Sequence, residues 1–500
     1  MLDSAHAVDL CHPLLLVSIS IGVAAGSRVK NSKDFAVAGR HLPLPVVTAT
    51  VFATWFGAEA VFGVSATFAT EGLRGVVADP FGSSLCLVLA GLFFSRYLYR
   101  LNILTLGDFF RLRFGRGIEV LTTLAIVASY LGWVSAQIKA LGLILNIVTG
   151  GALSEEAGML LGTAVVLTYT TFGGMLSVAI LDFVQMGVVM GGIFFIAMLV
   201  AEQTGGVAPV LESARAAGRL EFFPPPDLSE WLGFLAAWIT MMLGSIPQQD
   251  VFQRITSART AQIAIWGSVL GASIYFCFTF VPMFIAYAST LVDPQVFGGL
   301  LESDPQRLLP TLVMTHTPLL AQAVFFGAVL SAIMSCSSAT LLAPSVSFAE
   351  NIIRGAVPEM PDHRFLWVMR FTIVGFALLV LAFALNTNAS IFKMVENAYK
   401  VTLAGAFVPL VVGALWKRAT TQGAYAAIVL GIGGWLLTEF VLGEAALLPP
   451  QLAGLGMSLL GIVAGSLLPQ AVRNHGEHLA RPTHAHTAGR SPQLVPGHHH

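Results

Sequence analysis

The sequence predicts an all-α integral membrane protein with about thirteen membrane-spanning helices, and three observations support this fold class. Hydrophobic residues make up 56% of the 500 residues and charged residues only 11%, against about a quarter charged residues in a soluble domain. Apolar segments long enough to cross a bilayer follow one another with short breaks. Basic residues gather in every second break, which is typical of helices that cross a membrane in alternating directions.

The apolar segments give the expected spans in order. The first one has no basic residues before it and no small-residue cleavage site after it, so we expect it to remain as a spanning helix rather than to be removed as a signal peptide. We expect the spans near 9–27, 43–69, 76–98, 118–149, 157–177, 179–202, 231–252, 261–289, 318–352, 365–386, 391–416, 422–442 and 451–470.

The loops predict the orientation of the chain. Loops of one parity are basic, and they include Arg28, Lys30, Lys33, Arg40, Arg100, Arg111, Arg113, Arg116, Arg254, Arg259, Arg354, Arg364, Lys417 and Arg418. Loops of the other parity are mostly acidic. Because basic loops stay in the cytoplasm, we predict a plasma membrane or bacterial inner membrane protein with its N-terminus outside and its C-terminus in the cytoplasm.

The same pattern divides the chain into five regions. Residues 1–42 hold an extracellular N-terminus, the first spanning helix and a basic cytoplasmic loop. Two groups of five helices follow at 43–202 and 231–416, and two further spanning helices fill 417–470. Residues 471–500 are polar and rich in His and Pro, which predicts a disordered cytoplasmic tail.

Two of the expected spans carry helix-weakening residues at membrane depth. The second span contains Gly57 and Gly63 with the carboxylate of Glu59 between them, and the seventh contains Pro247 followed by Gln248, Gln249 and Asp250. Glycine and proline free backbone groups from helical bonding. These are the opening helices of the two five-helix groups, and interrupted helices at corresponding places in two halves indicate a transport site. A pair of ordinary kinked helices is the alternative.

Polar residues also mark the ninth span, which contains Ser331, Ser335, Cys336, Ser337 and Ser338. Hydroxyl and carbonyl oxygens suit a small hard cation such as sodium, whereas serines in membrane helices often bond back to their own helix. Asp182, at the start of the sixth span, fits either an ion ligand or an interfacial helix cap. The spacing alone leaves these alternatives open.

Two tryptophans lie well inside their spans. Trp55 and Trp133 are far enough from the segment ends to differ from the interfacial belt that tryptophan usually forms. Because the face of an indole ring attracts ammonium groups, both are candidate walls of a site for an organic cation.

The chain resembles the sodium:solute symporter family, which includes sodium/proline, sodium/sugar and high-affinity choline transporters. The resemblance runs from about Val8 to Pro469. It rests on four motifs: 34–43 (DFAVAGRHLP), 173–185 (GGMLSVAILDFVQ), 332–336 (AIMSC) and 416–424 (WKRATTQGA). The resemblance implies an inverted five-plus-five helix repeat of LeuT type, alternating access, and a sodium site between the two repeats.

The resemblance also implies the ligands of the ion. Ala53, Phe56 and Ala332 would contribute backbone carbonyls and Ser335 a hydroxyl. The last ligand of the family pattern is Ser or Thr, and this chain has Cys336. Asp182 matches the acidic residue that the family links to ion binding. Since a neutral thiol is a weak donor for a hard cation, we predict sodium as the coupling ion and keep a proton as the alternative.

Within the family, the closest likeness is to the high-affinity choline branch, with proline permease as a wider relative. Trp55 and Trp133 fall where that branch has cage tryptophans, whereas Gln248 and Ser83 replace a tryptophan and a tyrosine. We expect Trp55, Phe56, Glu59, Trp133 and Gln248 to face the solute. A choline-like cation, a proline-like zwitterion and a carboxylate all remain open.

These observations favour a secondary active symporter that imports a small organic solute. A membrane sensor built on a transporter scaffold is the second class, and it would call for a soluble signalling domain, which we do not expect. An enzyme would call for a compact cluster of His, Asp and Glu inside the membrane, and the sequence shows none. The net charge of −1 gives no reason to expect nucleic acid as a partner. The expected partners are the solute and the lipid bilayer, with no obligate protein partner.

Overall fold

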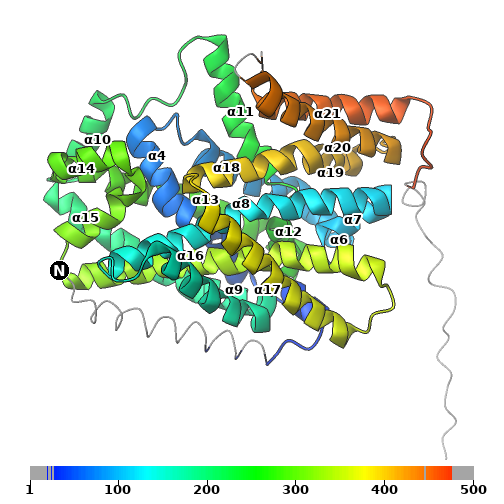
Figure 1. Ribbon diagram of the computed structural model, residues 1–500, viewed down its shortest axis with the longest axis horizontal. Coiled ribbons are helices and arrows are strands. Elements are labelled where there is room, and N and C mark those ends of the chain that lie inside the picture. The colour runs from blue at the N-terminus through cyan, green and yellow to red at the C-terminus, as the bar shows by residue number, and fades with distance from the viewer. Residues whose placement is uncertain (1–19, 21–23, 25–26, 444–445, 447, 476–500) are drawn as a thin grey trace, which may run out of the picture.

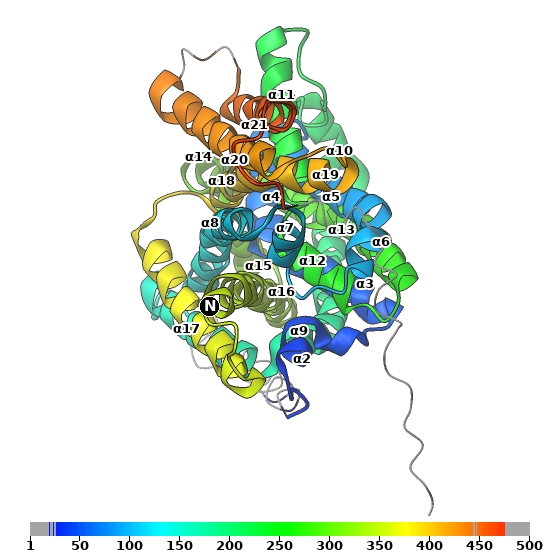
Figure 2. The same ribbon diagram turned by 90° about the vertical axis from the view of Figure 1, so that its right-hand side faces the viewer.

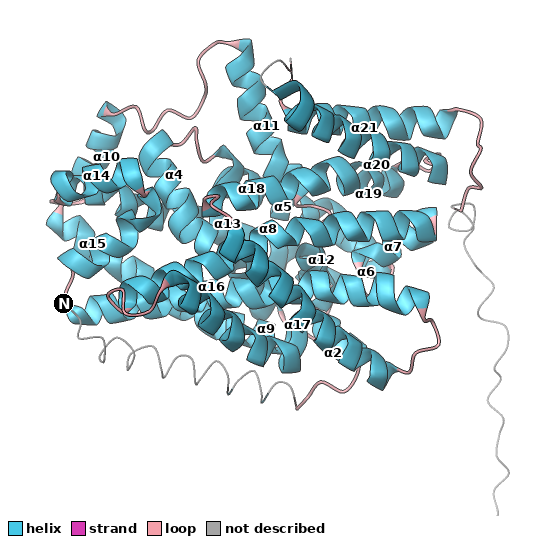
Figure 3. Ribbon diagram, in the orientation of Figure 1, coloured by secondary structure: helices cyan, strands magenta, loops and turns pink. Residues whose placement is uncertain are grey.

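A computed structural model describes residues 20, 24, 27–443, 446 and 448–475. Most of the first predicted span, 9–27, and the predicted tail beyond residue 475 lie outside the described residues. The described part is built from helices (Figure 3), and its one recorded β-bridge joins Leu42 to Ala258. The prediction of an all-α fold is confirmed.

The first predicted five-helix group contains one bent pair and three further spans. α3 (Leu44–Trp55) is bent by 55° against the stretch Glu59–Glu71, which consists of the π-helical turn η2 (Glu59–Gly63) and α4 (Val64–Glu71). The remaining helices are η3 (Val77–Gly82), α5 (Ser83–Leu89), η4 (Ala90–Phe94), α6 (Ser95–Arg100), α8 (Arg116–Val148) and α9 (Glu155–Gln203).

The second group repeats this order. α11 (Leu228–Gly244) is bent by 44° against α12 (Gln249–Ser257). It is followed by α13 (Ala261–Val292), α16 (Leu319–Phe348) with η6 (Ala349–Arg354), α17 (Asp362–Asn386), and α18 (Ile391–Thr402) with η7 (Leu403–Phe407) and α19 (Val408–Leu415). The bent helices therefore open both groups where the sequence predicts them, although the group boundaries themselves stay predictions.

Two helices lie outside the groups and pack against each other. α20 (Thr421–Leu436), continued by η8 (Leu437–Leu442), runs beside α21 (Pro450–Leu467) at the top of Figure 1. Short helices cap the ends of the bundle: α2 (Ser32–Val37), η1 (Ala38–Arg40), α7 (Leu106–Phe114), α10 (Val207–Ala216), α14 (Pro294–Ser303), η5 (Pro305–Arg307) and α15 (Leu308–His316). In Figure 1, α10, α14 and α15 gather at one end of the bundle.

Within the described residues, nine helices are long and apolar enough to cross a membrane, or eleven when each bent pair is counted as a span. α9 has 49 residues, and at about 1.5 Å per residue it is more than twice as long as the hydrocarbon core of about 30 Å. It contains one non-helical residue, Gly174. The two spans predicted at 157–177 and 179–202 are therefore joined at a break in one element, and the total of about thirteen stays a prediction.

The centre of the bundle is formed by helices from both groups. α16 packs against α8 and α9, α18 packs against α8, and α3 packs against α13. Figure 2 looks along the long axis of Figure 1 and shows α16 and α8 end on in the interior, with α17 at the side. The two bent helices thus meet α8 and α16 in the middle of the molecule, where backbone leaves the helical pattern away from lipid.

The break in α9 gives a first testable prediction. Gly174 has φ +53° and ψ −148°, a conformation that costs other residues about 1–3 kcal/mol. A Cβ there would lie 2.6 Å from both Cδ2 and the carbonyl oxygen of Phe35, which adds a steric cost. We expect Gly174→Ala to lower the melting temperature of the purified protein.

Gly187 provides the matched control for that experiment, because it lies in the same helix with open space around its Cα. Alanine is the better helix former, so Gly187→Ala is expected to leave the melting temperature unchanged or slightly higher. Equal melting temperatures for the two variants would contradict the account of the break.

Candidate functional site

The break that follows α3 releases backbone carbonyls in the interior. Phe56 leaves the helix with φ −86° and ψ 77°. The Gly57 amide then donates to the Trp55 carbonyl at 3.1 Å, and the Ala58 amide donates to Gln137 Oε1 at 2.9 Å. Neither amide closes the i to i−4 bond that a continuous helix would make to Ala53 or Thr54. The carbonyls of Ala53 and Thr54 are therefore released from helical bonding at mid-span.

Glycine is required at this break because three helices meet there. A Cβ on Gly57 would lie 2.6 Å from Gln137 Oε1 on α8 and 2.8 Å from Cys336 Sγ on α16. Both distances are below 3.0 Å, which real Cβ atoms essentially never show, and Gln137 Oε1 is held in place by the Ala58 amide. Gly57 therefore sets how closely α3, α8 and α16 approach one another.

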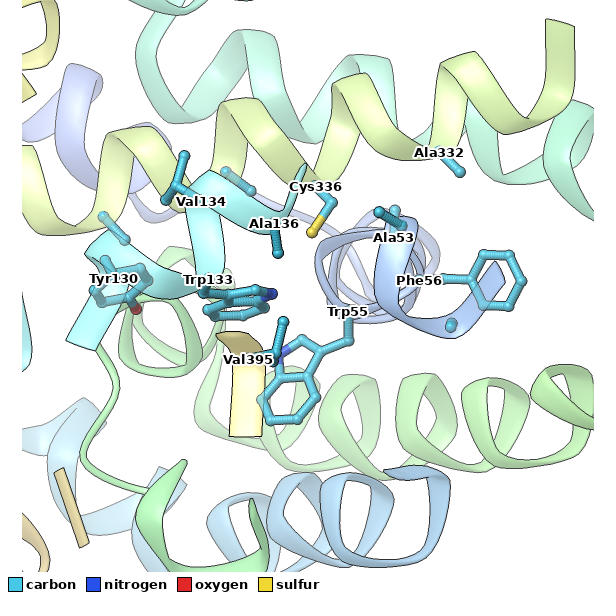
Figure 4. Packing of buried hydrophobic residues seen from close by; sticks show 14 of the residues in the cluster. Ala53, Trp55, Phe56, Tyr130, Trp133, Val134, Ala136, Ala332, Cys336 and Val395 are labelled. Atoms are coloured by element: carbon cyan, nitrogen blue, oxygen red, sulfur yellow. The ribbon is translucent and has the colours of Figure 1, made fainter. Parts of the chain in front are cut away.

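The stretch of α16 that faces the break carries the residues predicted to bind the ion. The Cys336 thiol donates to the Thr54 carbonyl at 2.8 Å, and Figure 4 shows Cys336 beside Ala53, with Ala332 further along the same helix. Ala53 is 5% exposed and Ala332 3% exposed. The structure thus brings Ala53, Ala332, Ser335 and Cys336 to facing helices in the interior.

Asp182 joins three helices of this region. One carboxylate oxygen of Asp182, on α9, accepts a hydrogen bond from the Ser335 hydroxyl, and the other accepts from the Thr50 hydroxyl on α3. Asp182 is fully buried in the middle of α9, so it is not an interfacial helix cap. Ser337 and Ser338 bond back to carbonyls of their own helix, and Ser335 instead points across to Asp182.

Trp55, which directly follows Ala53 and Thr54 in the last turn of α3, belongs to a box of four aromatic rings. Trp55 and Trp133 meet edge to face with ring centroids 5.8 Å apart. Tyr399 of α18 stacks on Trp55 at 6.1 Å and lies 5.6 Å from Trp133. Tyr130 stacks on Trp133 at 5.7 Å. We call these four residues the aromatic box; Figure 4 shows Trp55, Tyr130 and Trp133.

Asp250 ties the aromatic box to the second bent helix. It lies at the start of α12 and is fully buried. One carboxylate oxygen accepts from Trp55 Nε1 at 3.2 Å, and the other accepts from the Tyr130 hydroxyl. That hydroxyl in turn accepts the Asp250 amide at 2.9 Å. Asp250 therefore positions rings from α3 and α8, and it places a carboxylate beside the box.

Two residues that the sequence predicts to contact the solute, Gln248 and Phe56, do not belong to the aromatic box. Gln248 is 1% exposed, and its amide nitrogen donates to the Ser129 hydroxyl at 2.9 Å, so it holds the break of α11 and α12 against α8. The Phe56 ring points away from Trp55 (Figure 4) and stacks on Phe52 at 5.0 Å. Glu59 is 2% exposed on η2 and faces the interior.

The sequence did not predict three residues at this place as site residues: Tyr130, Tyr399 and Asp250, although Asp250 was noted in the interrupted seventh span. Tyr130 lies three residues before Trp133 and so shares its helix face, a signal that the sequence offers. Tyr399 and Asp250 come from distant segments, and nothing local marks them as neighbours of Trp55.

One end of the bundle contains a cavity, and the other is closed by backbone bonds. Near the outer ends of α4, α11 and α18 lies a cavity of about 400 Å³. It is lined by charged residues, namely Glu71, Arg74, Glu230, Lys393 and Glu396. Glu396 is one helical turn from Tyr399 of the aromatic box. We call this cavity the vestibule.

The closed end is held by backbone bonds between the segment before α3 and the end of α12. The Leu42 amide donates to the Ser257 carbonyl at 3.1 Å, and the Arg259 amide donates to the Leu42 carbonyl at 2.9 Å. The Gln253 side chain donates to the Ala36 carbonyl at 3.1 Å. These contacts lie on the side of the basic loops.

Comparison with known proteins identifies relatives of the whole bundle. A model of the family described as "Sodium:solute symporter family" matches residues 35–431. High affinity choline transporter 1 of Homo sapiens is 27% identical over 432 residues, which cover 83% of this chain and 74% of that protein. The sodium/proline symporter of Haemophilus influenzae is 26% identical over 435 residues, covering 82% of this chain and 84% of that protein.

Solved structures show the same fold. A Na+-coupled sialic acid symporter in a substrate-bound outward-open state matches with a TM-score of 0.80 at 17% identity, covering 92% of this chain and 97% of that chain. MhsT in complex with L-phenylalanine matches with a TM-score of 0.55 at 15% identity, covering 85% and 97%. These likenesses confirm the LeuT-type fold class.

The family model covers most of the chain, and the relatives are transporters rather than enzymes. Sodium as the coupling ion and a multi-pass membrane location follow from the family. The chain belongs to the sodium:solute symporter family and is a sodium-driven symporter of a small solute.

Proposed function

We propose that this symporter imports a small organic solute across the plasma membrane by alternating access. In this proposal the solute binds in the aromatic box, and sodium binds at the break that follows α3. The observation that carries it is the break itself, which puts released carbonyls next to the polar face of α16 and directly before Trp55 in the chain. The proposed ion and solute would both contact residues next to the break after α3. Coupling requires that each ligand change the free energy of binding of the other.

The proposed sodium ligands are the carbonyls of Ala53, Phe56 and Ala332, the Ser335 hydroxyl, and the group at position 336. Oxygen ligands suit a hard monovalent cation. Asp182 contributes negative charge through its bond to Ser335. The buried Arg254 guanidinium also acts electrostatically on Asp182, so it is the contact between Asp182 and Ser335 that supports an ion site at this junction.

A substitution at Cys336 tests whether position 336 belongs to the ion ligands. Sulfur is a softer donor than oxygen, so we expect Cys336→Ser to lower the sodium concentration for half-maximal uptake by about 3- to 10-fold, the equivalent of one ordinary hydrogen bond. Sodium-dependent uptake in proteoliposomes measures it. Cys277→Ser, at an exposed cysteine of α13, is the matched control. An unchanged sodium dependence in Cys336→Ser would remove position 336 from the ligand set.

In this proposal the two ends of the bundle are assigned to the two sides of the membrane. The closed end lies with the basic loops, which we assign to the cytoplasm. The vestibule at the other end would then admit solute from outside. The proposal therefore includes the predicted N-terminus outside and C-terminus in the cytoplasm. Labelling of introduced cysteines at Gln203 and Arg364 by a membrane-impermeant reagent in intact cells is expected to modify only the first.

The solute class is proposed from the aromatic box. The faces of the four rings favour positive charge, and the Asp250 carboxylate beside them shares its charge with the buried Arg254. Two relatives are named for choline and proline transport, and both solutes carry a cationic nitrogen. We therefore propose a small organic cation or zwitterion as the solute.

A thermal-shift screen tests this function. Purified protein is heated with candidate cations, zwitterions and carboxylates, each with and without sodium. A ligand of the folded state raises the melting temperature by mass action, and a coupled solute is expected to raise it more when sodium is present. A solute whose stabilisation does not depend on sodium would argue against coupling through a shared break.

A further inference from the structure

Four buried polar atoms around the aromatic box have no hydrogen-bond partner among the described residues. They are Glu59 Oε1, Trp133 Nε1, Gln137 Nε2 and the Tyr399 hydroxyl. Glu59 is 2% exposed, Trp133 1%, and the other two 0%. Buried polar groups in native proteins are nearly always paired, and a group left unpaired is costly. Their gathering in one place indicates a bound molecule that supplies the missing partners.

Glu59 lies between the aromatic box and a second carboxylate. The residue before it, Ala58, is bonded to Gln137, and the Glu59 carboxylate acts electrostatically on Tyr399 and Cys336. On its other side it interacts with Asp79 of η3. The turn η2 that carries Glu59 packs against α18, which carries Tyr399 of the box.

Asp79 is held as a hydrogen-bond acceptor. The Tyr275 hydroxyl donates to both oxygens of Asp79, at 2.7 Å and 2.8 Å, and the Ser83 hydroxyl donates as well. Glu59 has no such donors. In the described part of the chain, neither carboxyl group forms an ion pair with a lysine, arginine or histidine.

Two carboxyl groups without a basic partner are costly in a membrane core. A cation with N–H donors would remove this cost, because it supplies both charge and the hydrogen bond that Glu59 lacks. The rings of Trp55 and Tyr399 would face the rest of such a cation. The Trp133 and Gln137 donors would bond an oxygen of the same molecule.

We propose that Glu59 is the ammonium receptor of the solute site and that the solute is an amine that carries at least one N–H, with an oxygen acceptor in the same molecule. Amino alcohols and amino acids have this chemistry. The proposal rests on the proposed function, since it takes the aromatic box as the solute site. It goes further in excluding quaternary ammonium compounds, which have no N–H to offer Glu59.

The expected selectivity is large. A site built to bond a polar hydrogen of its ligand discriminates against analogues that lack it by about 10⁴-fold where the site is rigid and dry. Because cation–π attraction to the box is kept by a quaternary ion, we expect the net preference to be at least about 100-fold.

Two methylation series test the proposal. The purified full-length protein is titrated in sodium chloride with ethanolamine and its N-methyl derivatives up to choline, and with glycine and its derivatives up to glycine betaine. Affinity is read from thermal shift and from calorimetry. We expect binding by members with an N–H in one series or both, and a drop of at least about 100-fold at the quaternary member.

Substitutions distinguish two roles for Glu59: a charged group that binds the ammonium of the solute, and a buried acid that stays neutral. Glu59→Gln keeps the shape and loses the charge, so it is expected to weaken amine binding by at least about 10-fold, while stabilisation by sodium alone is kept as proof of folding. Asp79→Asn is expected to weaken it less. Glu212→Gln, exposed on α10, is the matched control.

Three results would overturn the proposal: quaternary members that bind as well as their N–H parents, Glu59→Gln that binds amines like the wild type, or a protein stabilised by sodium that binds no amine of either series. Each of them leaves sodium symport through the aromatic box intact. Amine binding that depends on Glu59 with uptake indifferent to sodium would instead support the receptor and contradict the proposed coupling.

Discussion

Ser335→Ala is expected to raise the sodium concentration for half-maximal uptake by about 10- to 100-fold. The Ser335 hydroxyl is a proposed ion ligand, and it also donates to the Asp182 carboxylate. A hydrogen bond to a charged group contributes about 1.5–3 kcal/mol, and each 1.4 kcal/mol is about a factor of ten. The variant loses an oxygen ligand and leaves one Asp182 oxygen without its donor.

Ser337→Ala is the matched control for this prediction. Ser337 lies on the same turn of α16 and is equally buried, but its hydroxyl donates to the Ile333 carbonyl of its own helix at 2.6 Å. We expect its sodium dependence to match the wild type. The measurement is initial uptake in proteoliposomes over a range of external sodium. If the two alanine variants respond to sodium alike, Ser335 is not a ligand.

Trp133→Ala is expected to reduce solute affinity by at least about 30-fold. Trp133 contacts three other rings of the aromatic box, and cation–π contacts in a desolvated site contribute about 2 kcal/mol or more. Truncation also leaves a cavity, and Trp→Ala in a core costs about 3–5 kcal/mol of stability. The affinity has to be measured on protein that still folds.

Two further variants keep that measurement interpretable. Trp133→Phe retains an aromatic face at lower cost in volume, so it is expected to recover part of the affinity. Trp266→Ala removes a tryptophan that is 54% exposed on α13 and is expected to bind solute like the wild type. In each variant, a rise in melting temperature on addition of sodium alone shows that the protein is folded. Solute binding that survives in Trp133→Ala would move the site away from the aromatic box.

The sequence predicted the backbone features of the site because they have local causes. Gly57 and Pro247 weaken helices wherever they occur, and the bends of 55° and 44° lie at those positions. The family motif around Ser335 and Cys336 likewise pointed to the part of α16 that faces the break. Local chemistry was sufficient for the two bends, whereas the stretch of α16 was indicated by the family resemblance.

Side-chain partners were harder to predict because they come from distant segments. Asp182 and Ser335 are 153 residues apart, so the choice between helix cap and ion-site residue depended on packing that the sequence does not display. Gln248 was predicted to face the solute, yet its amide is bonded to Ser129, 119 residues away. In the sequence, Tyr399 does not differ from other residues of an apolar helix. Its position in the aromatic box depends on the packing of α18 against α8.

At Gly174 the sequence predicted a boundary between two spans only approximately. The sequence placed a boundary between two spans near residue 178, and the structure has a break inside one helical element at Gly174. No polar loop marks the turn, because a single glycine conformation is sufficient to make it. Hydropathy detects the length of an apolar region more readily than a break of one residue.

The most direct test of the central claim, that sodium binding at the break drives solute through the aromatic box, is uphill transport in proteoliposomes. An inward sodium gradient is imposed without a proton gradient, and uptake of the solute found by thermal shift is followed over time. We expect transient accumulation above the external concentration, abolished by a sodium ionophore and not by a protonophore, and strongly reduced in Ser335→Ala. Accumulation that persists without a sodium gradient, or that Ser335→Ala leaves unchanged, would contradict the account.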